Sequence, residues 1–296
     1  MGRRCGASPT APEARSSLRA VTATLERLGL EPGTRALLVS VGGLGLSHAS
    51  NYAVYAALRL GVGSTSALMV PCPWARDAAA SYRNDDIGVQ FTLNAEFERY
   101  RWGPITMSPS LIDGDGGFPR TIEDLWDHAD IDELRRECRA QVTRAVQWGI
   151  DVTHLDTHLG ALTLRPEFFD IYLEMAEEFD LPIQLPDELT EPRVQFPLRE
   201  LAAEVGVLHA DRVVSLRSAG SREALLDLLR NLTPGLTEVR LRPAIDSSEL
   251  RAFDPDWLTK IAEYQLLTGD AELNAVLSSV RPIGYRLIRD AQRRLR

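Results

Sequence analysis

The chain has 296 residues, 44% of them hydrophobic and 25% charged, and its formal net charge is −9 at pH 7. This is the composition of an ordinary globular protein, and the negative charge argues against a broad electrostatic contact with nucleic acid or an anionic membrane. No apolar run approaches the roughly 20 residues needed to span a bilayer, and the N-terminal residues have no apolar core of a secretory signal. We therefore expect a cytoplasmic protein that binds neither nucleic acid nor membrane.

The first residues differ in composition from the rest. Residues 2–17 are rich in Ala, Pro, Ser and Arg and show no periodicity, which is typical of a disordered segment. We predict a disordered lead over residues 1–17 and a single domain over residues 18–296. Cys5, Cys72 and Cys138 lie far apart in the sequence and have no paired metal-binding spacing, so we expect free thiols.

Apolar runs of strand length alternate with amphipathic helical patterns along the remaining chain. Strands that alternate with helices build parallel βαβ units, which places the chain in the α/β class. A single distorted (β/α) barrel of the TIM type is the simplest way to close such a sheet. In chain order, the patterns predict strands at 35–41, 64–70, 87–93, 152–155, 181–185 and 237–241, and helices at 48–60, 131–148, 166–179 and 223–232, followed by further helices near the C-terminus.

In such a barrel, the reactive groups lie where the strands end and the next loop begins. The most informative strand end is T-H-L-D-T-H at residues 153–158. Side chains alternate between the two faces of a strand, so His154, Asp156 and His158 would point the same way. Imidazole and carboxylate are common zinc ligands, which indicates a metal or acid–base site. The alternative, that two of the three are surface residues at a strand end, is about equally supported by spacing alone. The same rule nominates residues 41–48, 90–96, 156–160, 184–188 and 242–246.

The connection from Asn94 to Asp130 is long and has little periodicity, and it contains Tyr100, Trp102 and Trp126. A loop of this length in a compact domain is usually functional. Its aromatic rings would stack on sugars if they are exposed. The alternative is that Trp102 and Trp126 fold the loop onto the domain.

A glycine-rich turn follows the first predicted strand, with Gly42, Gly43 and Gly45 before a helix. The spacing differs from G-x-G-x-x-G, and no acidic residue follows the next strand at Val70, which argues against a dinucleotide site. Anion binding by backbone amides at this turn, assisted by Arg242, stays open.

Several motifs agree with the THLDTH segment. They are L-L-V-S-V-G-G-L-G-L-S-H-A-S-N at 37–51, S-T-S-A-L-M-V-P at 64–71, G-V-Q-F-T-L-N at 88–94 and T-E-V-R-L-R-P-A at 237–244. Taken in order, they resemble the YdjC-like family of carbohydrate deacetylases, which includes chitooligosaccharide and hopanoid-associated deacetylases. The resemblance extends from about residue 36 to 293. It implies a distorted (β/α) barrel and hydrolysis of an N-acetyl group from an amino sugar by a divalent metal such as magnesium or zinc.

The chain departs from this family at the positions that carry the chemistry. The resemblance implies paired aspartates, one a metal ligand and one a general base, where this chain has Gly42 and Gly43. It implies a metal-binding histidine at Gln90, a histidine at Arg242 and an arginine at Gln184. His158 matches the family's ligand and has Asp156 beside it.

These departures have chemical consequences. A catalytic zinc site needs about three protein ligands and an open position for water. Glycine offers no carboxylate, and the amide of Gln90 binds zinc poorly and does not titrate. Arg242 adds a permanent cation, which disfavours a divalent metal and favours a carboxylate or phosphate. We therefore expect no metal cofactor, although the family uses one, and His158 is the one candidate metal ligand.

Three functions remain open. The first is a working deacetylase that uses His154, Asp156 and His158 as its metal site. The second is a non-catalytic protein that binds a sugar or an anionic ligand in the inherited pocket. The third is a metal-independent enzyme of secondary metabolism, with His158 as acid or base and Arg242 as an anion clamp. We assign catalysis to His158, Asp156 and Arg242 and expect a small-molecule ligand, an amino sugar or an anionic compound, with a homodimer left open. The predicted substrate-binding residues are Gln90, Asn94, Trp102 and Gln184.

Overall fold

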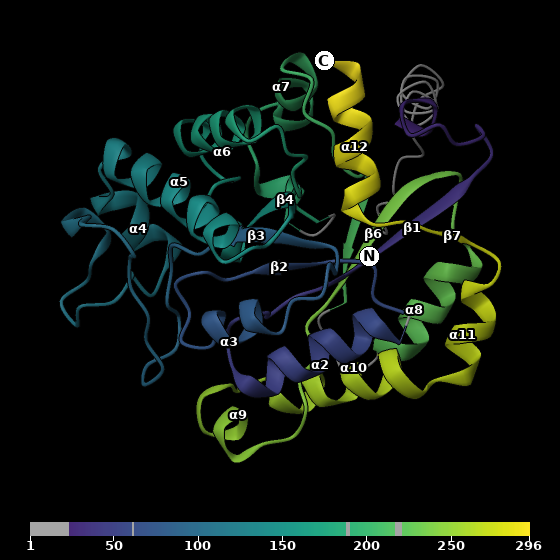
Figure 1. Ribbon diagram of the computed structural model, residues 1–296, viewed down its shortest axis with the longest axis horizontal. Coiled ribbons are helices and arrows are strands. Elements are labelled where there is room, and N and C mark those ends of the chain that lie inside the picture. Colours follow the sequence, from purple (N-terminus) through teal and green to yellow (C-terminus); the bar gives the residue numbers. More distant parts are fainter. Residues whose placement is uncertain (1–23, 61, 188–189, 217–220) are drawn as a thin grey trace, which may run out of the picture.

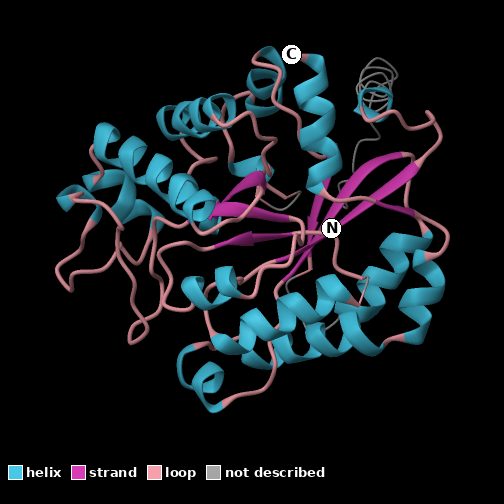
Figure 2. Cartoon of the chain, viewed as in Figure 1, coloured by secondary structure: helices cyan, strands magenta, loops and turns pink. Residues whose placement is uncertain are grey.

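A computed structural model describes residues 24–60, 62–187, 190–216 and 221–296. The predicted disordered lead at residues 1–17, with Cys5, lies outside these residues. Strands occupy the middle of the molecule and helices lie on both sides of them (Figures 1 and 2). No helix in the described ranges is long and apolar enough to cross a membrane. Cys72 and Cys138 are buried free thiols, as predicted.

The strands form two parallel sheets, which confirms the predicted α/β class. One sheet has the order β5-β6-β1-β7 and the other β2-β3-β4. The longest pairing joins β1 to β6 in register from Arg35 opposite Gly235 to Val41 opposite Leu241. The first sheet contains β1 (Arg35–Val41), β5 (Arg212–Ser215), β6 (Gly235–Leu241) and β7 (Arg281–Pro282), and the second contains β2 (Ser66–Leu68), β3 (Ile87–Phe91) and β4 (Val152–Thr157).

The predicted strand at 181–185 is wrong. This segment forms a single parallel bridge, from Ile183 to Leu155, in place of a ladder. Pro182 has no backbone N–H to donate, although its carbonyl accepts from Leu155 N at 2.9 Å. A second isolated bridge joins Ser40 of β1 to Thr65 just before β2.

The helices cover the strands from two sides. In Figure 1, α2, α8, α10 and α11 lie along one side, while α5 and α6 lie on the other. Helix α2 begins where the hydroxyl of Ser47 accepts a hydrogen bond from Ser50 N at 3.1 Å, a standard N-cap. The helices are α2 (His48–Arg59), α3 (Ala75–Ala80), α4 (Ile122–His128), α5 (Ile131–Gln147), α6 (Pro166–Glu178), α7 (Leu198–Glu204), α8 (Ser221–Arg230), α9 (Ser248–Phe253), α10 (Trp257–Gly269), α11 (Ala271–Leu277) and α12 (Tyr285–Leu295), with short 3₁₀ helices η1 (Pro109–Leu111), η2 (His158–Gly160) and η3 (Glu191–Arg193).

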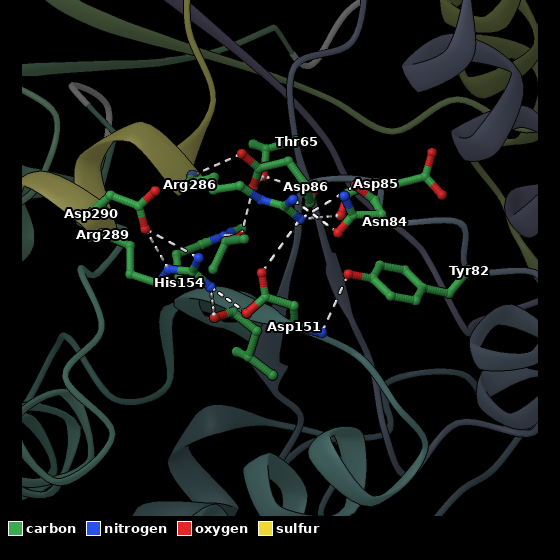
Figure 3. A network of polar contacts seen from close by, with 12 residues as sticks. Thr65, Tyr82, Asn84, Asp85, Asp86, Asp151, His154, Arg286, Arg289 and Asp290 are labelled. Carbon is green, nitrogen blue, oxygen red and sulfur yellow. Dashed lines mark hydrogen bonds and ion pairs between the residues drawn. The ribbon is translucent and has the colours of Figure 1, made fainter.

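A polar network fixes the start of α12 against the amino ends of the β2-β3-β4 sheet (Figure 3). The Oδ1 atom of buried Asp86 accepts hydrogen bonds from the Thr65 hydroxyl at 2.9 Å and the Thr153 hydroxyl at 2.6 Å. Its Oδ2 accepts from the backbone N–H of Arg286 at 2.8 Å. Burial raises the pKa of Asp86, and these hydrogen bonds oppose that rise. The carboxylate therefore ties three separate segments of the chain together.

Substitution of Gly284 should reveal how tightly this network is packed. A Cβ atom at Gly284 would lie 2.2 Å from Asp86 Oδ2, so we expect Gly284→Ala to lower the free energy of unfolding by about 2 kcal/mol. The φ angle of −116° is accessible to alanine, so the effect is steric. Urea unfolding measures it. The matched control is Gly269→Ala, which meets no atom within 4 Å, and equal stability of the two variants would contradict the prediction.

Candidate active site

Two adjoining cavities lie at the carboxyl ends of the strands. The inner cavity has a volume of about 70 Å³ and the outer one about 330 Å³. They share Leu159, Arg240, Leu241 and Arg242 in their walls, so they form two parts of one cleft. The outer volume falls in the range of small-molecule sites.

The inner cavity brings together several residues that the sequence nominated from different strand ends. Gln90, Asp156, Gln184 and Arg242 all line it. The Nε2 atom of Gln90 donates a short hydrogen bond to Asp156 Oδ2, across the β3–β4 pairing in which these two residues lie opposite each other. Their roles toward a substrate stay predictions.

A buried polar network forms the floor of the inner cavity. Glu238 is fully buried, and its Oε1 accepts from Gln184 Nε2 at 2.6 Å and from Arg240 Nε at 3.0 Å. Its Oε2 accepts from the Tyr285 hydroxyl at 2.8 Å, and Gln184 Nε2 also donates to Ser40 Oγ at 2.9 Å. Such a network holds the side chains at the cavity wall in one geometry.

His158 is paired with a residue that the sequence did not single out. Its Nε2 lies 2.9 Å from Oε2 of Glu96, and His158 is buried while Glu96 lines the outer cavity. Burial would raise the pKa of Glu96, but the charge and hydrogen bond of His158, with a smaller contribution from Arg242, lower it to about 2. Glu96 is therefore a carboxylate that orients the imidazole. Its position at the end of the nominated range 90–96 was the one available signal.

His154 lies apart from this cleft, in the network of Figure 3. Its ring stacks on Tyr285 with centroids 4.0 Å apart, and burial lowers its pKa to about 3. Gly88 makes room for it, because a Cβ there would lie 2.4 Å from the His154 carbonyl oxygen and 2.5 Å from the ring. The neutral ring packs between β3 and the start of α12.

The glycine turn and Arg242 occupy neighbouring space. A Cβ at Gly42 would lie 3.5 Å from Cγ of Arg242. The aliphatic part of the Arg242 side chain therefore packs directly beside Gly42. Gly43 has a φ of +92°, a conformation that glycine adopts without strain. The backbone N–H of Arg242 donates to Glu263 Oε2 at 2.6 Å.

Asn94 and Trp102, which the sequence analysis predicts to bind substrate, form hydrogen bonds to the backbone of the long loop. Asn94 is fully buried and donates to the carbonyl oxygens of Pro119 at 3.1 Å and Thr121 at 2.6 Å. The indole N–H of Trp102 donates to the Asn94 carbonyl at 2.9 Å. Neither residue lines the cleft, and buried Trp102 folds the loop onto the domain, the alternative left open above. The loop also contains α4, whose N-cap Thr121 accepts from Asp124 N.

Glu263 is a second group missed by the sequence analysis. It comes from α10, is 3% exposed and lines the outer cavity. Burial raises its pKa to about 7, against the hydrogen bond and charge of Arg242 and the charge of Lys260. A search of the residues that follow strands does not identify Glu263, because this side chain projects from the middle of a helix.

The raised pKa of Glu263 predicts a pH dependence of stability. Because the pKa in the folded state exceeds the ordinary value of 4.5, the folded chain binds more protons between pH 4.5 and 7. Stability from this group is complete below about pH 4.5 and is lost as the pH rises through 7, by about 3 kcal/mol. We expect Glu263→Gln to remove this decline in urea unfolding at pH 5 and pH 8. Exposed Glu223→Gln, the control, should keep it, and an unchanged pH profile in Glu263→Gln would contradict the assignment.

The carboxylate and imidazole groups near the cleft are engaged by neighbouring side chains. Within the described ranges, no group of three or more His, Cys, Asp or Glu side chains is arranged to hold a metal ion. One oxygen of Asp156 is engaged by Gln90, and His158 Nε2 faces Glu96. A catalytic zinc ion needs about three protein ligands and an open position for water.

The sequence is similar to those of several named deacetylases. The chain is 38% identical over 273 residues to a carbohydrate deacetylase of Thermus thermophilus, covering 90% of this chain and 98% of the relative. It is 26% identical to a carbohydrate deacetylase of Thermoanaerobacter pseudethanolicus, covering 78% of this chain and 90% of the relative. A chitooligosaccharide deacetylase of Yersinia pestis is 31% identical over 50% of this chain and 58% of its own length.

The fold has a counterpart among solved structures. A protein of Enterococcus faecalis V583, named for cellobiose-phosphate cleavage, superimposes with a TM-score of 0.75 at 21% identity, covering 86% of this chain and 99% of that chain. The family model described as YdjC-like protein matches residues 37–278. With most of its length matched by this model and by a relative at 38% identity, the chain belongs to the YdjC-like protein family.

Proposed function

We propose that this chain is a carbohydrate-binding member of its family that does not carry out metal-dependent deacetylation. The names of its relatives support a carbohydrate as the ligand class. The cleft at the strand ends supports a small-molecule site of matching size. The isolated parallel bridges Ser40–Thr65, Leu44–Leu68 and Leu155–Ile183 support a distorted barrel as the frame of this site.

The observation that carries the proposal is the side-chain set around Asp156. Where the family resemblance implies an aspartate and a histidine, Gly43 has no side chain and Gln90 donates its amide hydrogen to Asp156. A donor N–H pointing at a carboxylate oxygen competes with a cation for that oxygen. Arg242 adds a guanidinium to the wall of both cavities, and a guanidinium has no lone pair with which to bind a metal ion.

Acetate release and sugar binding together test the proposal. We expect no acetate from N,N′-diacetylchitobiose with added zinc, magnesium, nickel or cobalt, and calorimetric binding of chitobiose-type sugars in the presence of a chelator. Metal-dependent acetate release that is lost in His158→Ala would contradict the proposal.

A second candidate is a metal-independent enzyme, and one observation favours it. Two carboxyl groups of the outer cavity have opposite pKa shifts, with Glu96 at about 2 and Glu263 at about 7. A carboxylate and a carboxylic acid in one cavity are typical of acid–base catalysis. Turnover of a bound sugar without metal, reduced at least tenfold in Glu263→Gln, would select this candidate.

A further inference from the structure

The orientation of the Gln184 amide is determined by its neighbours. Its Nε2 faces Glu238 Oε1 and Ser40 Oγ. Glu238 Oε1 is a carboxyl oxygen that already accepts from Arg240. The Gln184 atom facing it must therefore be a donor, which is the amide nitrogen and not the amide oxygen. The carbonyl Oε1 of Gln184 is then left as a buried acceptor that has no hydrogen-bond partner within the described residues.

An unpartnered buried acceptor is costly unless something else donates to it. Gln184 is 1% exposed and lines the inner cavity. A ligand group that enters this cavity and satisfies Gln184 Oε1 must therefore be a hydrogen-bond donor. A carboxylate group has no hydrogen to give and does not meet this requirement.

Asp156 supplies a second acceptor in the same cavity. Gln90 occupies its Oδ2, and no described residue donates a hydrogen bond to its Oδ1. Asp156 lies beside Gln90 and Gln184 in the cavity wall and is 8% exposed. Two residues that line the inner cavity thus each have an oxygen atom without a donor among the described residues.

The carboxylates around the inner cavity offset its arginines. Asp156 and Asp187 line the cavity together with Arg240 and Arg242, and buried Glu238 is hydrogen-bonded to Arg240. Arg242 also has a carboxylate neighbour, since its charge acts on Glu96. An anionic ligand would therefore meet arginines that already have carboxylate neighbours.

The two cavities differ in size and suit different parts of a ligand. The outer cavity of about 330 Å³ is large enough for a sugar ring, whereas the inner one of about 70 Å³ is suited to a small substituent. A protonated primary amine carries three donors, a positive charge and no acceptor, as the ammonium of lysine does. This substituent matches the two oxygens, one of which belongs to a carboxylate.

We propose that the inner cavity binds the protonated primary amine of a deacetylated amino sugar, with Asp156 and Gln184 Oε1 as its acceptors. The proposal rests on the proposed function. It states that the chain binds an amino sugar in its free-amine form, which is the product of the deacetylation for which its relatives are named. The sugar ring then lies in the outer cavity beside Leu159 and Arg242.

Four disaccharides test this assignment on the native protein by calorimetry at pH 6. They are the β-1,4-linked glucosamine disaccharide with free amines, its N,N′-diacetylated form, cellobiose, which has hydroxyls in place of the amines, and the anionic cellobionate. We expect the free-amine sugar to bind at least tenfold more tightly than each of the other three. Equal or tighter binding of the acetylated, neutral or anionic sugar would overturn the proposal.

A variant and a pH series locate the amine. Asp156→Asn removes the charge while its side-chain oxygen still accepts from Gln90, and it should reduce free-amine affinity at least tenfold while affecting cellobiose less than twofold. Asp115→Asn is the control, because it removes an equal charge from a side chain that is 63% exposed and paired with Arg120, and it should bind as the native protein does. Native affinity should fall as the pH rises above about 8, where an amine of this type loses its proton.

Failure here is distinguishable from failure of the proposed function. Metal-dependent acetate release would refute the proposed function whatever the affinities are. Absence of acetate release together with a preference for the acetylated sugar would refute the amine assignment alone. A loss of affinity in Asp156→Asn that is equal for all four sugars would mean that Asp156 shapes the cleft without contacting an amine.

Discussion

Replacement of Glu238 by alanine is expected to lower the free energy of unfolding by about 3–5 kcal/mol. The carboxylate is fully buried and accepts hydrogen bonds from Gln184, Arg240 and Tyr285. Its removal would take one acceptor from each of these three donors and break the ion pair with Arg240. It would also open a cavity in the floor of the site.

Urea unfolding with circular dichroism measures this loss. Tyr285→Phe is the matched control, because it removes one of the three donors and should cost about 1 kcal/mol. A loss below about 1 kcal/mol in Glu238→Ala would show that the network contributes little to stability.

Restoration of the missing ligands should give the largest change in metal affinity. The combined variant Gly42→Asp, Gly43→Asp, Gln90→His and Arg242→His adds the side chains that the family resemblance implies and removes the guanidinium. We expect it to bind one zinc ion with micromolar or better affinity, whereas the native chain should show no zinc binding at the same concentrations. Single changes should have little effect, because a ligand set acts as a unit.

The structure adds a cost to this restoration. The φ of Gly43 is +92°, and aspartate there should cost about 1–3 kcal/mol of stability, part of which bound zinc would return. Zinc titration of the folded variant, with His158→Ala added as the control, measures the gain. A folded variant without zinc affinity would mean that the cleft differs from a metal site in more than its ligands.

The elements that the sequence predicted best are those whose pattern is local. β1 begins and ends where the apolar run 35–41 does, and α5 differs from its predicted range by one residue, because periodicity and N-caps are visible in the chain itself. The segment 181–185 looked like a strand for the same reason. Its apolar residues do lie in the core, but Pro182 prevents the ladder.

The site was predictable only in part. Placement at strand ends brought Gln90, Asp156, Gln184 and Arg242 to one cavity. Glu96 and Glu263 were missed because their importance depends on partners far away in the sequence, His158 and Arg242. Equal spacing grouped His154 with Asp156 and His158, yet the fully buried ring of His154 stacks on Tyr285 and does not line the cleft.

The central claim is that this cleft does not hold a catalytic metal, and elemental analysis of the purified native protein after dialysis tests it most directly. We predict well below one equivalent of zinc, nickel or magnesium per chain, unchanged in His158→Ala. One equivalent of metal that survives dialysis and is lost in His158→Ala would contradict the claim.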